Sequence, residues 1–333
     1  MNVLYLIGNG FDKSLGLKTA YSDFYDYYCS LEEKDERVCA LKNEIEADKQ
    51  NWADLELALG KYSGKIERQQ DFEEVFFNLS DNLVQHLRNQ QDSIADEELD
   101  KPGFCNMLFA PASELTGPDR RRVPMGNAYE TNTVDIITFN YTNILDRLLE
   151  SKGGMVNVAS KNANNGITWR VRSLRHVHGT LDGTIVMGVN DVSQVANKAF
   201  AENQDVRDLL VKPESNSSIK ADVDTVCKNL IETADTIVLF GSSLGETDKL
   251  WWQLIGQRLS RQNTRLIIYF YDAGLNIGAN REQLRGRMER KVRQQFLDVA
   301  GLGLDEDKMR DKILVGVNTR MFAGIRKKGV GKK

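Results

Sequence analysis

Residues 3–12 read VLYLIGNGFD, an apolar run of five residues that ends directly at Gly-Asn-Gly. A β-branched and aliphatic run that stops at a glycine-rich turn is typical of a buried strand feeding a helix. No basic segment precedes the run, and the run is shorter than the apolar core of a signal peptide. We therefore interpret these residues as the first strand of the fold.

The same succession of strand, turn and helix recurs along the chain. Apolar runs predict further strands at residues 134–138, 174–178, 184–189, 236–240 and 265–271. Helical periodicity predicts helices at residues 21–31, 52–61, 71–89, 143–151, 225–233, 247–261 and 281–299. Strands that alternate with helices form parallel sheets with crossover helices. The expected fold class is α/β, with three layers, a mainly parallel Rossmann-like sheet and a helical insertion.

The domain organisation follows from where this alternation is interrupted. We expect a Rossmann-like α/β domain over residues 1–30 and 130–320, with a helical insertion over residues 31–129. The pattern fades over residues 90–132, which hold four of the five prolines, and we interpret this stretch as a Pro-rich surface loop. The end of the chain, residues 321–333, is basic and glycine-rich and is expected to be a flexible tail.

The composition excludes several classes of protein. The 333 residues include 44 Lys plus Arg and 48 Asp plus Glu, and this net charge of −4 disfavours nucleic acid as a general partner. The apolar runs are strand-sized, so no membrane span is predicted. The four cysteines are scattered and form no CxxC pair, which disfavours zinc and indicates a reducing environment. We expect a cytoplasmic protein that needs no metal.

Polar or glycine-rich motifs follow four of the predicted strands. Ligands of open parallel sheets bind beyond the carboxyl ends of the strands, so these motifs are the candidate site. They read GNGFD at residues 8–12, TFNYTN at 138–143, HVHG at 176–179 and GSSLG at 241–245. Gly8 and Gly10 allow close backbone approach, and with the following helix they outline a phosphate cradle. The third glycine of the dinucleotide fingerprint is replaced by Lys13, so a tight turn without a ligand is the alternative.

Three side chains in or near these motifs are candidates for catalysis. His178 can act as a general base near neutral pH, and the alternative is a hydrogen-bonded core histidine. Asn140 can orient a ribose hydroxyl or an amide, and the alternative is a helix cap. Glu56, in the helical insertion, is a second candidate acid or base, and the alternative is an exposed helix carboxylate.

Two further polar groups have structural alternatives. Ser243 and Glu246 have the spacing of a capping box, which is compatible with phosphate binding by the same turn. Asp248 is an additional polar candidate at the start of that helix. The basic triplet at residues 120–122 can contact a phosphate, and the alternative is a solvated turn.

Taken in order, the motifs resemble the AbiH family of bacterial phage abortive-infection proteins over about residues 1–270. The resemblance is carried by LIGNGFD at residues 6–12, GL at 16–17, YSDF at 21–24, WADLE at 52–56, FNYT at 139–142, HVHG at 176–179 and GSSLGETD at 241–248. This resemblance implies a role in defence against bacteriophage, with a phage-derived trigger and an oligomer as further expectations.

More distantly, the pattern is similar to the sirtuin-like (DHS-like) NAD-binding fold. In this resemblance, residues 8–10 match its glycine loop, Asn140 its asparagine, and His178 with Gly179 its catalytic histidine and glycine. Thr142 stands where that pattern has an acid, and the zinc-binding cysteines are missing. The resemblance therefore implies a zinc-free protein that hydrolyses NAD or senses a nucleotide, and disfavours protein deacetylation.

The resulting hypothesis is an anti-phage protein that binds NAD or a related nucleotide and cleaves its glycosidic bond. The expected catalytic residues are His178, Asn140 and Glu56. The residues expected to contact the nucleotide are Gly8, Asn9, Gly10, Phe11, Asp12, Thr138, Asn140, Tyr141, Gly179, Gly241, Ser242, Ser243 and Asp248. The alternatives are a non-catalytic nucleotide sensor or interaction module, and an effector that targets nucleic acid through residues 120–122 and the basic tail.

Overall fold

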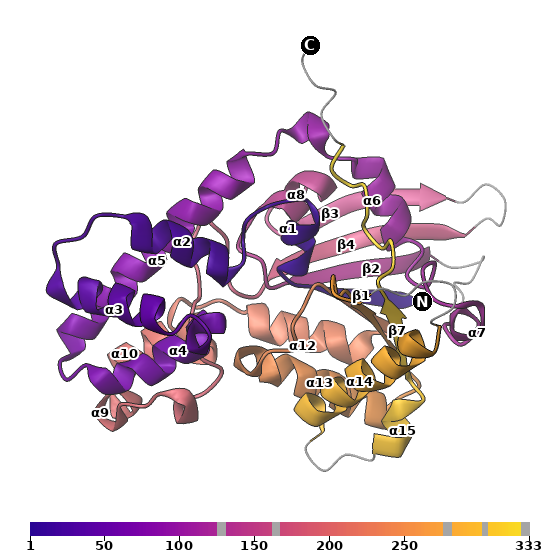
Figure 1. The fold of residues 1–333 in the computed structure, drawn as a ribbon. Coiled ribbons are helices and arrows are strands. Elements are labelled where there is room, and N and C mark those ends of the chain that lie inside the picture. The colour runs from indigo at the N-terminus through magenta and orange to yellow at the C-terminus, as the bar shows by residue number, and fades with distance from the viewer. Residues whose placement is uncertain (125–130, 162–166, 276–281, 302–305, 328–333) are drawn as a thin grey trace.

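A seven-stranded sheet forms the centre of the molecule (Figure 1). The computed structural model describes residues 1–124, 131–161, 167–275, 282–301 and 306–327. The strands are β1 (Asn2–Ile7), β2 (Thr131–Thr138), β3 (Met155–Lys161), β4 (Thr168–His176), β5 (Thr236–Phe240), β6 (Arg265–Phe270) and β7 (Ile313–Val317). They lie in the order β3-β4-β2-β1-β5-β6-β7.

The sheet has the strand order of a Rossmann-like fold. Only β3 runs antiparallel, at the edge beside β4, and the other neighbouring strands of the sheet pair in parallel. Numbered along the chain, the six parallel strands have the spatial order 3-2-1-4-5-6 of the doubly wound fold. The order reverses between β1 and β5, where such folds bind their ligands. The predicted mainly parallel α/β sheet is therefore confirmed.

Both faces of the sheet are buried, because side chains of a strand point alternately to opposite faces. On β1, Tyr5 and Ile7 belong to one hydrophobic cluster, whereas Leu4 and Leu6 belong to another. Elements that contribute to the first cluster include α6 (Lys101–Leu108) and α8 (Ile144–Leu149). Elements that contribute to the second are α12 (Val223–Thr233), α13 (Lys249–Arg261), α14 (Glu282–Ala300) and α15 (Glu306–Arg310). The three-layer arrangement follows from this division.

A third hydrophobic cluster lies beside the sheet and consists mainly of helices (Figure 1). We call it the helical cluster. Its elements include α2 (Tyr21–Ser30), α3 (Glu36–Ala47), α4 (Leu55–Tyr62), α5 (Gln69–Asp92), α9 (Lys198–Glu202) and α10 (Gln204–Leu210). The expected insertion over residues 31–129 therefore packs as two separate parts. Its first helices join residues 181–211 in the helical cluster, whereas α6 packs on the sheet.

The prediction of a Pro-rich surface loop over residues 90–132 is wrong as far as residue 124. Residues 125–130 lie outside the described residues. The stretch up to residue 124 contains α6 and α7 (Gly117–Arg120), and Phe104 and Leu108 of α6 are fully buried. Tyr5 of the central strand donates a hydrogen bond from its hydroxyl to the Leu108 carbonyl at 2.9 Å. Pro102 lies in the first turn of α6, where proline fits a helix. Two of the four prolines, Pro102 and Pro118, misled the prediction because they mark helix starts.

The expected flexible tail does not begin at residue 321. Met321, Phe322 and Ile325 are buried in the core, and Arg326 donates a hydrogen bond to Glu98 at 2.9 Å. The burial of these three apolar side chains holds the segment against the core, although its composition is basic. The remaining tail residues, 328–333, lie outside the described residues.

The strand expected at residues 184–189 is also wrong. This run forms only isolated bridges, from Gly179 to Ile185 and from Val189 to Val211. Both sides of β4 are already occupied by β2 and β3, so the run has no free edge to join and packs in the helical cluster instead. The sequence patterns missed β3, β7 and α3, and also α9, α10 and α11 (Lys212–Ser218). Among the described residues, no helix is long and apolar enough to cross a membrane.

Candidate functional site

A cavity of about 1010 Å³ opens at the carboxyl ends of β1, β2 and β5. It collects residues from all four predicted motifs and from the helical cluster. The predicted site residues that line it are Gly8, Asn9, Gly10, Asp12, Glu56, Asn140, Tyr141, His178, Gly241, Ser242, Ser243 and Asp248. Phe11, Thr138 and Gly179 do not line it.

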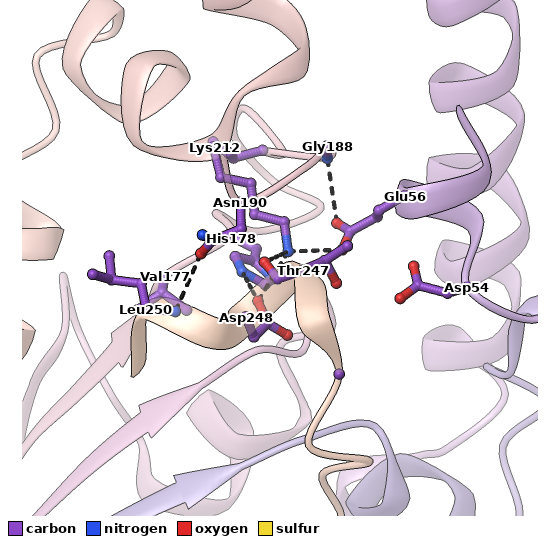
Figure 2. Close-up of polar contacts among 12 residues, drawn as sticks. Asp54, Glu56, Val177, His178, Gly188, Asn190, Lys212, Thr247, Asp248 and Leu250 are labelled. Atoms are coloured by element: carbon purple, nitrogen blue, oxygen red, sulfur yellow. Dashed lines mark hydrogen bonds and ion pairs between the residues drawn. The ribbon is translucent and has the colours of Figure 1, made fainter. Parts of the chain in front are cut away.

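The charged groups at one end of the cavity form a buried cluster (Figure 2). The Lys212 ammonium lies 2.7 Å from Glu56 Oε2 and 2.9 Å from Asp248 Oδ1, and it also donates to the Thr247 carbonyl. His178 Nε2 lies 3.1 Å from the same Asp248 oxygen, without the geometry of a hydrogen bond. We call Glu56, His178, Lys212 and Asp248 the charged cluster.

Four separate segments bring these side chains together. Glu56 lies in the first turn of α4, whose first backbone amides are capped by Asp54. His178 lies two residues beyond β4, and Lys212 is the first residue of α11. Asp248 ends the short 3-10 helix Glu246–Asp248 that precedes α13. The charged cluster therefore connects the helical cluster to the sheet.

Burial and charge shift the titration of this cluster in opposite directions. Burial raises the pKa of Glu56, against the effects of Lys212 and His178. Burial also disfavours the charge on Asp248, but Lys212 and His178 outweigh it and hold the Asp248 pKa below its usual range. For Lys212, burial favours the neutral amine, but Asp248 and Glu56 outweigh it and raise the pKa. Perturbed carboxyl groups beside a histidine in a cavity are typical of sites that move protons.

His178 is held by its surroundings as a potential base. Its side chain is buried between the rings of Phe139 and Tyr141, whose centroids lie 5.5 and 6.1 Å from the imidazole. The Val186 amide donates to the His178 carbonyl at 2.8 Å and fixes the backbone. The carboxylate of Asp248 can then stabilise the imidazolium that forms when His178 takes a proton.

A second buried carboxyl group, Asp12, faces the same cavity. It accepts hydrogen bonds from Asn140 Nδ2 at 3.1 Å and from Thr142 Oγ1 at 2.7 Å. Burial raises the pKa of Asp12 to about 6, although Thr142, Asn140 and the nearby His176 each lower it. Thr142, noted above as a departure from the sirtuin-like pattern, is thus a partner of a buried acid. Asn140 Oδ1 is buried and has no hydrogen-bond partner.

The glycine motif after β1 makes backbone contacts with the loop after β5. The Gly10 amide donates to the Gly241 carbonyl at 2.8 Å, and the Gly8 amide to the Phe240 carbonyl at 2.9 Å. A Cβ at Gly10 would lie 2.5 Å from Gly241 Cα, so this close approach requires glycine. Because these amides already have acceptors, they are poorly placed to hold a diphosphate. Lys13 is the one lysine or arginine among the described residues that line the cavity.

Other predicted contact residues have structural roles. Phe11 is fully buried against Phe104 and Phe322, and Thr138 donates to the Ile7 carbonyl. Gly179 has a φ of +73°, and a Cβ there would lie 1.9 Å from the Thr184 carbonyl oxygen. These residues stabilise the walls around the site and do not contact the cavity.

The predicted capping box at Ser243 and Glu246 is wrong. The 3-10 helix starts at Glu246 with Gly245 before it, and no side chain caps it. Glu246 instead pairs with Lys249 at 3.0 Å. The glycine before Glu246 takes the capping position, so Ser243 stays exposed at the cavity wall.

The sequence model of the family described as "Bacteriophage abortive infection AbiH" matches residues 4–270. The chain belongs to the AbiH family. No curated protein matches it. The matched range includes every member of the charged cluster and Asp12.

In this AbiH protein, sequence reasoning missed Lys212 and the site role of Asp54. Lys212 lies in a short helix between Val211 and Pro213, and no motif marks it as buried. Asp54 uses Oδ1 to cap α4, and its other oxygen has no hydrogen-bond partner among the described residues, although the side chain lines the cavity. The only signal for Asp54 was its place two residues before Glu56.

The remaining candidates of the AbiH protein contribute little to the cavity. Arg120 donates to three carbonyl groups of its own loop, and Arg122 pairs with Asp119 at 3.1 Å. Two of the three arginines of the basic triplet are therefore engaged within the protein. Within the described part of the chain, no group of three or more His, Cys, Asp or Glu side chains is arranged to hold a metal ion.

Proposed function

We propose that this AbiH protein is an anti-phage effector that binds NAD or a related nucleotide and hydrolyses its N-glycosidic bond. One observation carries the proposal: His178 and the carboxyl groups of Asp248, Glu56, Asp54 and Asp12 line one cavity at the switch point of a Rossmann-like sheet. Such a site combines a base with several negative charges.

These charges suit the chemistry of a glycosidic bond. Cleavage proceeds through a transition state in which the ribose carries positive charge as an oxocarbenium ion. Fixed carboxylates in a partly water-excluded cavity stabilise positive charge at the reacting carbon. The nicotinamide ring of NAD is itself cationic before cleavage and neutral afterwards, so the same carboxylates also hold the reactive group of the substrate.

The proposed reaction uses one water molecule. The water oxygen bonds to the anomeric carbon of the ribose while the bond from that carbon to the nicotinamide nitrogen breaks. The electron pair of the broken bond leaves with nicotinamide. His178 accepts the proton from water, Asp248 stabilises the imidazolium, and the proton then passes to solvent. Asn140 orients the ribose through its unpartnered Oδ1, a buried acceptor that matches a ribose hydroxyl. Lys212 holds Glu56 and Asp248 in place, with Glu56 as the second acid or base.

The cavity matches the ribose and the base of the nucleotide better than it matches the diphosphate. The ribose and its cationic base are matched by the carboxyl groups, whereas the diphosphate has Lys13 as its positively charged partner. The serine hydroxyls of the loop after β5, at Ser242 and Ser243, supply further donors along the cavity wall. The amides of Gly8 and Gly10 contribute little to diphosphate binding, because they already donate to the Phe240 and Gly241 carbonyls.

The test is product analysis after incubation of the purified protein with NAD, NADP, ATP and ADP-ribose. We expect release of nicotinamide from NAD or NADP by the wild type. We expect a loss of at least about a hundredfold in His178→Ala, because general bases contribute roughly that much or more. His178→Gln, which keeps a polar side chain, should be equally inactive. Thermal unfolding of all three proteins checks that the fold is intact.

Two outcomes would contradict the proposal. Equal activity of His178→Ala would remove the histidine from the chemistry. Saturable nucleotide binding without turnover by any of the four compounds would favour the sensor hypothesis, and growth inhibition by the protein would then be insensitive to His178→Ala.

A further inference from the structure

The cavity has a second end, formed by the last residue of β6, by the segments that follow β6 and β7, and by α14. Its lining includes Phe270, Tyr271, Gln295, Thr319 and Met321, and we call this region the aromatic end. The carboxyl ends of β1, β5, β6 and β7 lie along one edge of the sheet, so one ligand can extend from the charged cluster to the aromatic end.

Tyr271 is unusually exposed for a large aromatic side chain. Its exposure is 75%, and among the described residues the other exposed large apolar side chains, Phe77, Met155 and Ile219, do not line the cavity. A tyrosine at the rim of a cavity offers a flat surface that a bound ring can cover.

The loop that carries Tyr271 is fixed by its neighbours. Asn318, just beyond β7, accepts a hydrogen bond from the Asp272 amide at 2.8 Å and donates one to the Asp272 carbonyl at 2.9 Å. The same Asn318 amide also donates to the Leu275 carbonyl. Three hydrogen bonds from one side chain hold the backbone directly after Tyr271, so the ring is presented by an ordered loop.

The two ends of the cavity differ in charge. The carboxyl groups of Asp12, Asp54, Glu56 and Asp248 line the first end, whereas the described lining of the aromatic end contains no Asp, Glu, Lys, Arg or His. Its polar groups are neutral, such as the Gln295 amide and the Thr319 hydroxyl. An uncharged, flat, hydrogen-bonding group is therefore the matching occupant of the aromatic end.

We propose that the aromatic end is a subsite for the purine base of a two-headed nucleotide, with Tyr271 stacking on the base. This inference rests on the proposed function, because the glycosidic bond to be cleaved lies at the charged cluster. It narrows the substrate class to dinucleotides and disfavours mononucleotides of nicotinamide. Gln295 donates one hydrogen bond to the Ser243 carbonyl at 3.3 Å, which leaves its amide oxygen as an acceptor for the edge of the base.

The experiment compares NAD with nicotinamide mononucleotide, which lacks the adenosine half. For the wild type, we expect a higher kcat/KM on NAD. In Tyr271→Ala, the ratio of kcat/KM for NAD to that for the mononucleotide should fall about tenfold, since stacking of one base on an aromatic ring contributes at least that order of affinity. Tyr271→Phe keeps the ring and should retain the ratio of the wild type. Phe77→Ala, which removes an exposed aromatic ring outside the cavity, is the matched control.

Binding of ADP-ribose, measured by calorimetry, separates this inference from the proposed reaction. Weaker binding in Tyr271→Ala but not in Tyr271→Phe supports the subsite even if no nicotinamide is released. An unchanged substrate ratio together with unchanged ADP-ribose affinity in Tyr271→Ala would overturn the inference. An equal loss on NAD and on the mononucleotide would also overturn it, because it would indicate a general structural effect. No binding of ADP-ribose by the wild type would overturn the inference, whereas the release of nicotinamide from NAD decides the proposed reaction separately.

Discussion

The glycine loop after β1 and the charged cluster lie on the same cavity but differ in how their polar groups are engaged. In the glycine loop, the amides of Gly8 and Gly10 already donate to carbonyl groups of the neighbouring loop. In the charged cluster, Lys212 sits between two carboxylates, and His178 Nε2 has no hydrogen bond. The glycine loop has satisfied its amides through backbone hydrogen bonds, whereas the charged cluster is held by ion pairs between side chains at the cavity wall.

This difference separates a motif that shapes the cavity from side chains that carry charge beside it. The glycine loop is the most conspicuous motif of the sequence, yet its geometry serves contact between two loops. The charged cluster has one member, Lys212, that no motif marks, yet it concentrates the perturbed titratable groups. Conspicuous spacing in a sequence can therefore point to the place of a site without naming its reacting groups.

Removal of the Lys212 ammonium group should have the largest effect on the charged cluster. Lys212→Met leaves Glu56, only 4% exposed, without its ion-pair partner, and leaves Asp248 with His178 alone. Loss of one partner of a buried ion pair costs about 3–5 kcal/mol. We expect a decrease of that order in the free energy of unfolding, measured by urea denaturation, together with loss of nucleotide turnover.

An exposed lysine on the adjacent helix provides the control for this substitution. Lys249 pairs with Glu246 at 3.0 Å at the surface, and Lys249→Met should cost at most about 1 kcal/mol. Glu56→Gln combined with Lys212→Met should recover part of the loss. Equal stabilities of the two lysine variants would show that Lys212 is not a structural centre of the site.

The second prediction concerns the pH dependence of stability that arises from Asp12. Its pKa of about 6 in the folded protein exceeds the ordinary value of about 3.9, so the folded state binds the proton more tightly. Stability from this group is therefore fully present below about pH 4 and is lost as the pH rises to about 6. The loss amounts to at most about 3 kcal/mol, at about 1.4 kcal/mol per pKa unit.

Asp12→Asn, which cannot ionise, should lack this component of the pH dependence. We expect the variant to be more stable than the wild type at pH 7, with the difference vanishing near pH 4, as measured by urea denaturation at each pH. Asp81→Asn, an exposed position on α5, is the control and should leave the pH profile unchanged. A wild-type profile that is flat between pH 4 and 6 would contradict the raised pKa.

The smallest expected effect concerns the glycine loop. Gly10→Ala places a Cβ 2.5 Å from the Gly241 Cα, against backbone that cannot rotate away. Overpacking of this kind costs about 2 kcal/mol, so we expect a lower thermal unfolding temperature. Gly183→Ala is the matched control, because its Cβ would meet only the Thr180 hydroxyl oxygen at 3.6 Å. If Gly10→Ala kept wild-type stability but lost nucleotide binding, the loop would be a ligand cradle after all.

Much of the fold could be predicted from the sequence because its strands are short apolar runs bounded by glycine. The strand at residues 236–240 was predicted with its observed bounds, and the helices around it lie within a few residues of their predicted ends. The location of the site followed from the same pattern, since four strand ends carry polar motifs. Parallel topology then places all four of these strand ends side by side.

The features that could not be predicted from the sequence depend on contacts between distant segments of the chain. Residues 184–189 have the pattern of a strand but find no free sheet edge, and α6 follows a proline that starts a helix. The burial of Lys212 depends on α4 and on the start of α13, neither of which lies near it in sequence. No local pattern can indicate that a lysine will be enclosed by carboxylates 156 and 36 residues away.

The separation of these partners along the chain also has a consequence for synthesis of the protein. Glu56, His178, Lys212 and Asp248 are supplied by four segments, and the last of them emerges from the ribosome only after about three quarters of the chain. A nascent chain that lacks residue 248 has neither the anion beside His178 nor one of the two partners of Lys212. The charged cluster of this AbiH protein therefore cannot assemble until residue 248 has left the ribosome.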